Sequence, residues 1–324
     1  MEVSTPKKNT LVLCCILRNA EATIKAMLMS CIPYIDRAII CDVGSTDKTI
    51  EIASQFLSNC DKPFISVKIQ WNYNFAQARN CYLKEIKMSA THTLVLDADE
   101  LLVLTNDNFK ETLPDVGLVQ VRDISYGDDH FYPKIFKNHP NVFYEGDIRE
   151  TPIFPEHFQE PVKMKNLYIR DRSFDTNRVE KYMRELEICL RKDPFPHLPG
   201  RRAYYLALSA FHTRRMELAM HWFKKRSEME EGCSEEKWHA TMMVGSCYLI
   251  KDELEEGIKW LKRASLMRPW RLEPLALMER YYIMIEDYEN LKTIQMHLTL
   301  LPYPENDTLA IQDNLYFVEP SDMI

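Results

Sequence analysis

The sequence predicts an α/β domain with a mixed, mainly parallel sheet, followed by an all-α domain. In the first part of the chain, short apolar runs alternate with segments of helical period, and the connections between them are short. From about Asn177 onward the helical period continues without further strands. A chain of 324 residues, with 46% hydrophobic and 27% charged residues, has room for two globular domains. We therefore expect domains at 1–175 and 176–324.

The α/β prediction follows from the order of the segments. Apolar runs predict strands at Thr10–Leu17, Arg37–Cys41 and Phe64–Ile69, and a fourth strand that ends at Asp97. Apolar residues at helical spacing predict helices at Ala20–Ser30, Lys48–Leu57 and Phe75–Met88. Such alternation gives a parallel sheet covered on both faces. Further along, Val116–Val121 is expected to be a strand, and Tyr126–Pro161 a mixture of strands and loops.

The helical part contains an internal repeat. Small, aromatic, small, large, small and proline residues follow one another at Gly245, Tyr248, Gly257, Leu261, Ala264 and Pro269. This order is typical of a tetratricopeptide repeat, whose two antiparallel helices need small residues where they cross. A weaker copy begins near Ala203, and a third runs from Leu275 to Leu298. The alternative is a generic helical bundle.

Composition excludes several classes of protein. A net charge of −7 gives no basic footprint for nucleic acid or an anionic membrane. No apolar run approaches the roughly 20 residues of a membrane span. The run after Lys8 has about seven residues and no small-residue cleavage site after it, so it is expected to be a strand and not a signal peptide. The nine cysteines are scattered and form no C-x-x-C pair, which favours reduced thiols and a cytoplasmic protein.

An acidic stretch directly follows the fourth predicted strand. Thr93–Leu102 reads TLVLDADELL, with carboxylates at Asp97, Asp99 and Glu100. In open α/β sheets the ligand crevice lies beyond the carboxyl ends of the strands. Carboxylates this close repel one another unless a positive group lies among them, and their hard oxygens suit Mn²⁺ or Mg²⁺. The alternative is an acidic turn without a ligand.

Other polar residues follow the neighbouring strands at the same expected edge. The first strand is followed by Arg18, Asn19 and Glu21, and the second by Asp42 and a turn through Asp47. The helix that starts at Phe75 carries Arg79 and Asn80 near its beginning. An arginine there can hold a phosphate or pair with the acidic stretch. Helix caps, a turn and a surface ion pair are the structural alternatives for these residues.

The motifs in their order define a resemblance. LRNAEATI, CDVGSTDKTIEIASQF, NFAQARN and LVLDADELL resemble the family 2 glycosyltransferases, whose GT-A fold is a Rossmann-like, mainly parallel sheet. The resemblance extends to a subgroup with tetratricopeptide-like helices after that domain. It implies a nucleotide-sugar donor, most commonly a UDP-sugar, a divalent cation (Mn²⁺ or Mg²⁺), and inversion at the anomeric carbon.

The resemblance also implies roles for individual residues. Asp42 would contact the nucleoside, Asp97 the ribose or the water shell of the metal, and Asp99 the metal itself. Arg79 and Asn80 would line the donor pocket. Arg18, Asn19 and Glu21 are further donor-binding candidates.

An inverting transfer also needs a general base. The candidates are Glu145, Asp147 and Glu150, of which Glu150 is favoured because YEGDIRETP resembles a family segment Y-x-G-x-V-H-E-x-P. Arg149 replaces the usual histidine, and Arg170 or Asp171 stands where a second is often found. The chain is therefore expected to bind the metal weakly, or to use the charge of Arg149 instead. His130 and His139 could compensate.

Three functions stay open at the level of the sequence. The first is a hexosyltransferase acting on a glycan or peptide. The second is an inactive scaffold whose helical repeats bind a protein partner, a reading that Arg149 favours. The third is a metal-dependent phosphohydrolase. Such an enzyme ordinarily needs a nucleophilic aspartate or a second metal cluster, and the sequence shows neither. The repeats could also mediate a homodimer.

Overall fold

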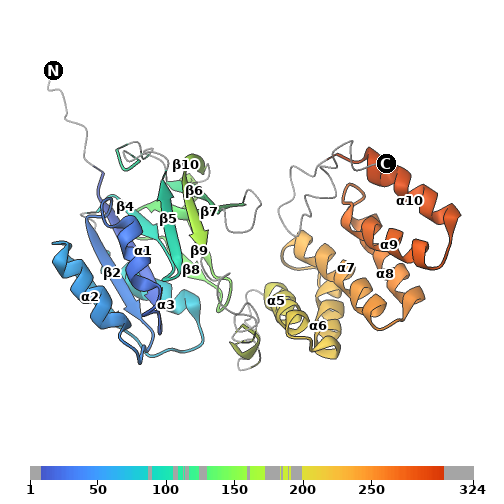
Figure 1. The fold of residues 1–324 in the computed structure, drawn as a ribbon, viewed down its shortest axis with the longest axis horizontal. Coiled ribbons are helices and arrows are strands. Elements are labelled where there is room, and N and C mark those ends of the chain that lie inside the picture. The colour runs from blue at the N-terminus through green and yellow to red at the C-terminus, as the bar shows by residue number, and fades with distance from the viewer. Residues whose placement is uncertain are drawn as a thin grey trace, which may run out of the picture. The chain divides into compact units, whose positions relative to one another are not determined.

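The computed structural model describes residues 9–302, apart from 87–89, 105–108, 112, 114–116, 124–129, 159–160, 172–182, 184, 189 and 191–198. The chain forms two compact units, Met1–Arg178 and Val179–Ile324. The predicted boundary between residues 175 and 176 lies outside the described residues. Figure 1 shows the strands of the first unit and the helices of the second.

The first unit contains the predicted alternation of strands and helices. Its first elements are β1 (Leu11–Leu17), α1 (Ile24–Cys31), β2 (Arg37–Asp42), α2 (Thr49–Asn59), β3 (Phe64–Lys68), α3 (Phe75–Glu85) and β4 (His92–Val95). The later elements are β5 (Glu100–Leu104), β6 (Leu118–Asp123), β7 (His130–Lys137), β8 (Phe143–Glu145), β9 (Thr151–Ile153), a 3₁₀ turn (Glu156–Phe158) and β10 (Val162–Asp171).

The main sheet is mixed and mainly parallel, as predicted. Its strand order is β3-β2-β1-β4-β7-β6-β10-β5, and β8 and β9 form a separate antiparallel pair. The run from β3 to β4 is parallel throughout, as is the pair of β6 and β10. The strands β1, β2 and β4 therefore end at the same edge of the sheet.

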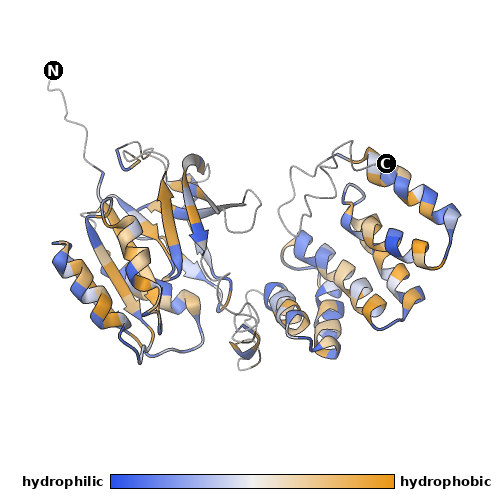
Figure 2. Cartoon of the chain, in the orientation of Figure 1, coloured by the Kyte–Doolittle hydropathy of each residue, from blue (hydrophilic) through white to orange (hydrophobic). Residues whose placement is uncertain are grey.

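Helices cover both faces of this sheet. The seven residues of β1 are all buried, and alternate side chains point to opposite faces. Leu11 and Leu13 pack in a core with α1 and α2, whereas Val12 and Cys14 pack in a second core with α3. Each fully buried aliphatic side chain of this kind stabilises the fold by about 1.5–3 kcal/mol. Figure 2 shows hydrophobic residues along the strands and mixed colours along the helices.

Several predicted boundaries were wrong. The helix expected from Ala20 begins at Ile24, because Asn19 has a φ of 51° and the backbone from Ala20 to Thr23 forms a turn. The fourth strand ends at Val95, so the acidic stretch is a turn after the strand. The residues after that turn form β5, a strand that was not predicted and that pairs with β10 at the far edge of the sheet.

The second unit is helical throughout its described part. Its helices are α5 (Pro199–His212), α6 (Met216–Glu228), α7 (Ser234–Ile250), α8 (Leu254–Met267), α9 (Glu273–Met284) and α10 (Tyr288–Leu300). Successive helices are joined by short turns, an arrangement compatible with tetratricopeptide-like pairs. No helix in the described ranges is long and apolar enough to cross a bilayer.

Small residues stand where α7 and α8 cross. A Cβ atom on Gly245 would lie 2.8 Å from Cγ of Leu261 and 3.0 Å from the carbonyl oxygen of Gly257. One on Gly257 would lie 2.7 Å from Cδ2 of Leu249 and 3.2 Å from the carbonyl oxygen of Gly245. The two helices approach this closely because both positions lack a side chain.

Candidate functional site

The loops after β1 and β2 are joined by hydrogen bonds through predicted site residues. Oδ1 of Asn19 accepts the backbone N–H of Thr46 at 2.8 Å, and Oε2 of Glu21 accepts that of Lys48 at 3.1 Å. In return, the N–H of Glu21 donates to Oδ2 of Asp47 at 3.2 Å. The side chains of Asn19 and Glu21 therefore shape the loop after β2, and Arg18 beside them is exposed.

Asp42 ends β2 and is buried, with 4% of its surface exposed. Its Oδ1 accepts the backbone N–H groups of Gly44 at 3.1 Å and Ser45 at 2.8 Å, which fixes the turn that follows. Gly44 has a φ of 104°, a conformation that favours glycine. Asp42 thus holds its own loop in shape at the edge where the ligand crevice is expected.

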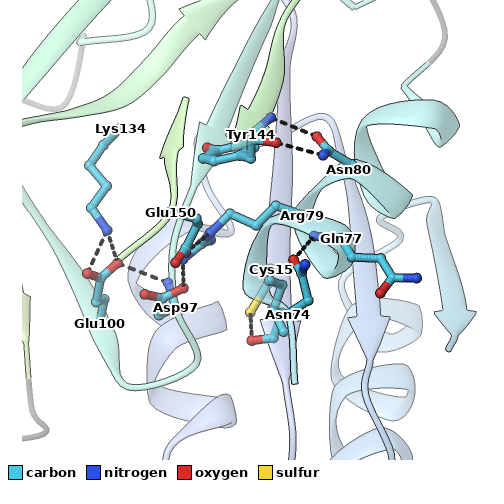
Figure 3. A network of polar contacts seen from close by, with 11 residues as sticks. Cys15, Asn74, Gln77, Arg79, Asn80, Asp97, Glu100, Lys134, Tyr144 and Glu150 are labelled. Atoms are coloured by element: carbon cyan, nitrogen blue, oxygen red, sulfur yellow. Dashed lines mark hydrogen bonds and ion pairs between the residues drawn. The ribbon is translucent and has the colours of Figure 1, made fainter. Parts of the chain in front are cut away.

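Arg79 is the centre of the site and is buried, with 8% of its surface exposed. It lies in the second turn of α3, whose first turn is capped by Asn74 through the N–H of Gln77 at 2.7 Å. Nη2 of Arg79 lies 2.9 Å from Oδ1 of Asp97, and Nε donates to Glu150. Figure 3 shows its guanidinium between the two carboxylates. One arginine thus joins the acidic turn after β4 to the favoured general base.

The two carboxylates stabilise the charged form of Arg79. Burial on its own would lower the pKa of this guanidinium, but Asp97 and Glu150 reverse that effect and hold the pKa well above its ordinary value. Arg79 is therefore permanently charged.

Glu100 faces a different cation from Asp97. Nζ of Lys134, on β7, lies 2.6 Å from each oxygen of Glu100. Burial raises the pKa of Glu100 to about 7 against the pull of Lys134. Burial would also lower the pKa of Lys134, but Glu100 and Asp97 hold it above its ordinary value, so the lysine stays charged. The repulsion expected among the acidic residues is thus relieved in part by basic residues of the protein itself.

The segment from β8 to β9 is fastened to α3. The side-chain amide of Asn80 donates to the carbonyl oxygen of Tyr144 at 2.9 Å and accepts its N–H at 2.8 Å. The N–H of Phe75 donates to the carbonyl oxygen of Asp147 at 3.0 Å. These bonds bring Glu150 to Arg79, and they occupy the amide of Asn80 with the backbone of β8.

Asp147 is buried beside the start of α3, with 4% of its surface exposed. Its Oδ1 accepts the N–H of Ile148 at 3.1 Å, whereas Oδ2 makes no hydrogen bond within the described part of the chain. A buried carboxylate oxygen without a partner is costly unless a ligand supplies one. Glu145, the other candidate base, is half-buried on β8, and Arg149 has a φ of 47° in the turn between the two strands.

The carboxylate oxygens of the acidic turn suit a divalent cation that is shared with a substrate. Within the described residues no group of three or more His, Cys, Asp or Glu side chains forms a closed metal site. Asp97, with 40% of its side chain exposed, and the half-buried Asp99 offer hard oxygens at the expected crevice. Mg²⁺-type ions are commonly held by one or two carboxylates together with substrate phosphates. His139 instead packs against the rings of His157 and Phe158.

Lys134 was missed by the sequence analysis. The sequence feature that could have indicated it is a lysine within a strand segment, directly followed by the buried apolar residues Ile135 and Phe136. Its importance depends on the register, because Ile135 pairs with Leu94 and this places Lys134 beside the end of β4.

Residues 12–104 match the model of glycosyl transferase family 2. This match lies within the first unit and confirms the resemblance that the motifs predicted. A comparison with curated protein sequences gave no match.

The chain is also similar to solved glycosyltransferase structures. Glucosyl-3-phosphoglycerate synthase from Mycobacterium tuberculosis, in complex with Mn²⁺, UDP and glucosyl-3-phosphoglycerate, is 20% identical over 37% of this chain and 45% of its own, with a TM-score of 0.27. The same enzyme with Mn²⁺ and UDP-glucose is 14% identical over 64% and 79%, with a TM-score of 0.35. GlyE of Streptococcus pneumoniae TIGR4 is 15% identical over 40% and 34%, with a TM-score of 0.30. The chain spans less than half the length of the first of these.

Proposed function

We propose that the protein is an inverting glycosyltransferase that moves a hexose from a UDP-sugar to a glycan or peptide acceptor. The match of residues 12–104 to glycosyl transferase family 2 supports the reaction class. The observation that carries the proposal is the pairing of Arg79 with both Asp97 and Glu150. It brings the acidic turn, a phosphate-binding cation and a candidate base together at the ends of parallel strands.

The donor would lie along the loops after β1, β2 and β4. Asp42 and the turn it fixes would receive the nucleoside, and Asp97 and Asp99 would hold Mn²⁺ or Mg²⁺. When bound, such an ion neutralises charge on the leaving diphosphate. Arg79 would stabilise the same charge from the protein side, because a buried guanidinium acts strongly on developing charge in a dry site.

Glu150 is the proposed base, and Asp147 is the second candidate. As the acceptor oxygen forms its bond to the anomeric carbon, the bond from that carbon to the diphosphate oxygen breaks and the acceptor proton passes to Glu150. Oε1 of Glu150 is occupied by the hydrogen bond from Nε of Arg79. The transfer therefore requires that the diphosphate draws Arg79 away from Glu150.

The helical unit is proposed to select the acceptor or to bind a protein partner, including a second copy of the chain. Repeated helical pairs expose extended surfaces of the kind that bind peptides. We also propose that the protein acts in the cytoplasm, which fits its scattered cysteines.

The test is a thermal-shift titration with UDP-sugars, repeated with Mn²⁺, Mg²⁺ and EDTA. A donor that binds the native state raises the apparent melting temperature, and we expect stabilisation that EDTA removes. Stabilisation in EDTA as well would mean that Arg149 or Arg79 replaces the ion.

A catalytically inactive scaffold is the second candidate, because the charge of Arg79 is already balanced within the protein. The absence of any stabilisation by nucleotide or metal in the titration would favour this reading.

A further inference from the structure

Lys134 occupies an unusual position for a charged residue. It lies in β7, next to the buried Ile135, with 14% of its side chain exposed. Burial of an ammonium group is costly unless it is paired. Its partner Glu100 has 10% of its side chain exposed and receives the lysine on both oxygens. Lys134 and Glu100 therefore form a buried ion pair beside the acidic turn.

The pair is linked to the backbone of the acidic turn. Oε2 of Glu100 accepts the N–H of Asp97 at 2.9 Å, and the N–H of Glu100 donates to the carbonyl oxygen of Asp97 at 3.0 Å. Lys134 thus fixes the backbone of Asp97 through Glu100, while Arg79 fixes its side chain from the other side. Figure 3 shows this chain of contacts from Lys134 to Arg79.

We propose that Lys134 is a positioning residue for the acidic turn. By holding Glu100 inward, it leaves Asp97 and Asp99 as the carboxylates of the turn that face the donor and its cation. Without the lysine, Glu100 would be a buried side chain with no counter-ion, and nothing would hold it inward against the N–H of Asp97. This inference rests on the proposed function.

The structure offers a matched control elsewhere in the same unit. Nζ of Lys110 lies 2.5 Å from Oδ2 of Asp36, and that oxygen accepts the N–H of Leu11 at 2.7 Å. This is the same arrangement of lysine, carboxylate and backbone N–H. It supports the beginning of β1, at the opposite end of the parallel strands from the acidic turn.

The experiment compares Lys134→Met with Lys110→Met in two measurements on the full chain. The first is calorimetric titration with UDP, in the presence of Mn²⁺ and in EDTA. Loss of a residue that orients a metal ligand typically weakens metal binding about 10–100-fold. We expect about a tenfold or greater loss of Mn²⁺-dependent UDP affinity in Lys134→Met, little change in EDTA, and little change in Lys110→Met.

The second measurement is hydrogen exchange at the amide of Asp97, which needs no ligand. We expect faster exchange in Lys134→Met and restored protection in Lys134→Arg, which keeps the charge. Wild-type exchange at Asp97 in Lys134→Met would overturn the inference, as would equal losses of affinity in the two methionine variants. If Lys134→Met does not fold, Lys134→Gln takes its place. A wild-type chain that does not bind UDP would refute the proposed function, whereas the exchange data would still decide the role of Lys134.

Discussion

At the scale of single residues, the site is built on charges that neutralise one another. Arg79 is paired with Asp97 and Glu150, and Lys134 with Glu100, so three carboxylates from two segments of the sequence meet two buried cations. Removing one member of a buried pair leaves the other charge without compensation. The stability of the domain and its proposed chemistry therefore depend on the same side chains.

Arg79→Met should lower the free energy of unfolding by about 3 kcal/mol, because Asp97 and Glu150 would then lie close together without a cation. Urea denaturation measures this loss. Arg79→Lys keeps the charge but not the planar fork, so it should recover only part of the stability. Wild-type stability in Arg79→Met would mean that the two carboxylates separate freely.

Asp99→Ala should abolish sugar transfer and leave the melting temperature within a few degrees of the wild type, because Asp99 is half-buried at the turn. Product formation from a UDP-sugar with Mn²⁺ measures the effect. Normal turnover that still requires Mn²⁺ would remove Asp99 as the proposed metal ligand.

Glu150→Gln should lose at least a hundredfold in turnover and keep donor affinity, since general-base catalysis typically contributes about 10²–10⁴-fold. Single-turnover kinetics and UDP titration separate the two effects. Asp147→Asn is the companion variant, and an unchanged rate in Glu150→Gln beside a loss in Asp147→Asn would move the base to Asp147.

At the scale of elements, local signals identified the parallel strands and failed where pairing is long-range. The strand β1 is apolar along its whole length and was predicted almost to the residue. The strand β5 was missed because its partner β10 begins nearly sixty residues later. The helix α1 starts late because Asn19 and Glu21 bond to the next loop, which no local pattern encodes.

The crossing of α7 and α8 makes a prediction about packing. Gly245→Ala places a methyl group 2.8 Å from Leu261 and 3.0 Å from a backbone oxygen. Overpacking of this kind costs about 1–3 kcal/mol, which outweighs the gain of about 1 kcal/mol in helix propensity. Thermal unfolding should report a net loss, and Ser246→Ala on the same helix should not. A stabilised Gly245→Ala would show that the crossing tolerates a wider separation.

The buried His239 on α7 makes the helical unit sensitive to acid. Burial, together with the charge of Arg271, lowers the pKa of His239 to about 3 from an ordinary value of 6.5. The unfolded chain takes up a proton below pH 6.5 and the folded chain does not, so stability is complete above pH 6.5 and falls as the pH drops toward 3. The loss should approach about 1.4 kcal/mol per pH unit in that range.

Urea denaturation at pH 7.5 and pH 5 measures this slope. In His239→Gln, the loss of stability between those two pH values should be smaller by about 2 kcal/mol. The control is His297→Gln, at an exposed position on α10, which should leave the loss as it is in the wild type. An unchanged slope in His239→Gln would contradict the assignment.

At the scale of the whole molecule, the candidate site lies within one unit. Every residue placed in it falls between Arg18 and Glu150, inside Met1–Arg178. The motifs name most of the side chains that meet here, but their pairing could not be predicted, because Arg79 and Glu150 are separated by 71 positions. Lys134 became visible only through the register of β7 against β4.

A chain cut after Arg178 should therefore still bind UDP with Mn²⁺, within about threefold of the full-length affinity by calorimetry. The expected loss is in use of the acceptor, since the helical unit is proposed to select it. Full activity of the shortened chain toward its acceptor would leave the helices with a role in assembly alone.

The double pairing of Arg79 also bears on which anions the site admits. An incoming anion must replace two carboxylates that already satisfy the guanidinium, and it must do so in a buried place. A small anion such as free phosphate forms too few contacts to compensate for both. The diphosphate of the proposed donor would add the contacts of its base and ribose, so the closed ion pair would discriminate in its favour over simple phosphates.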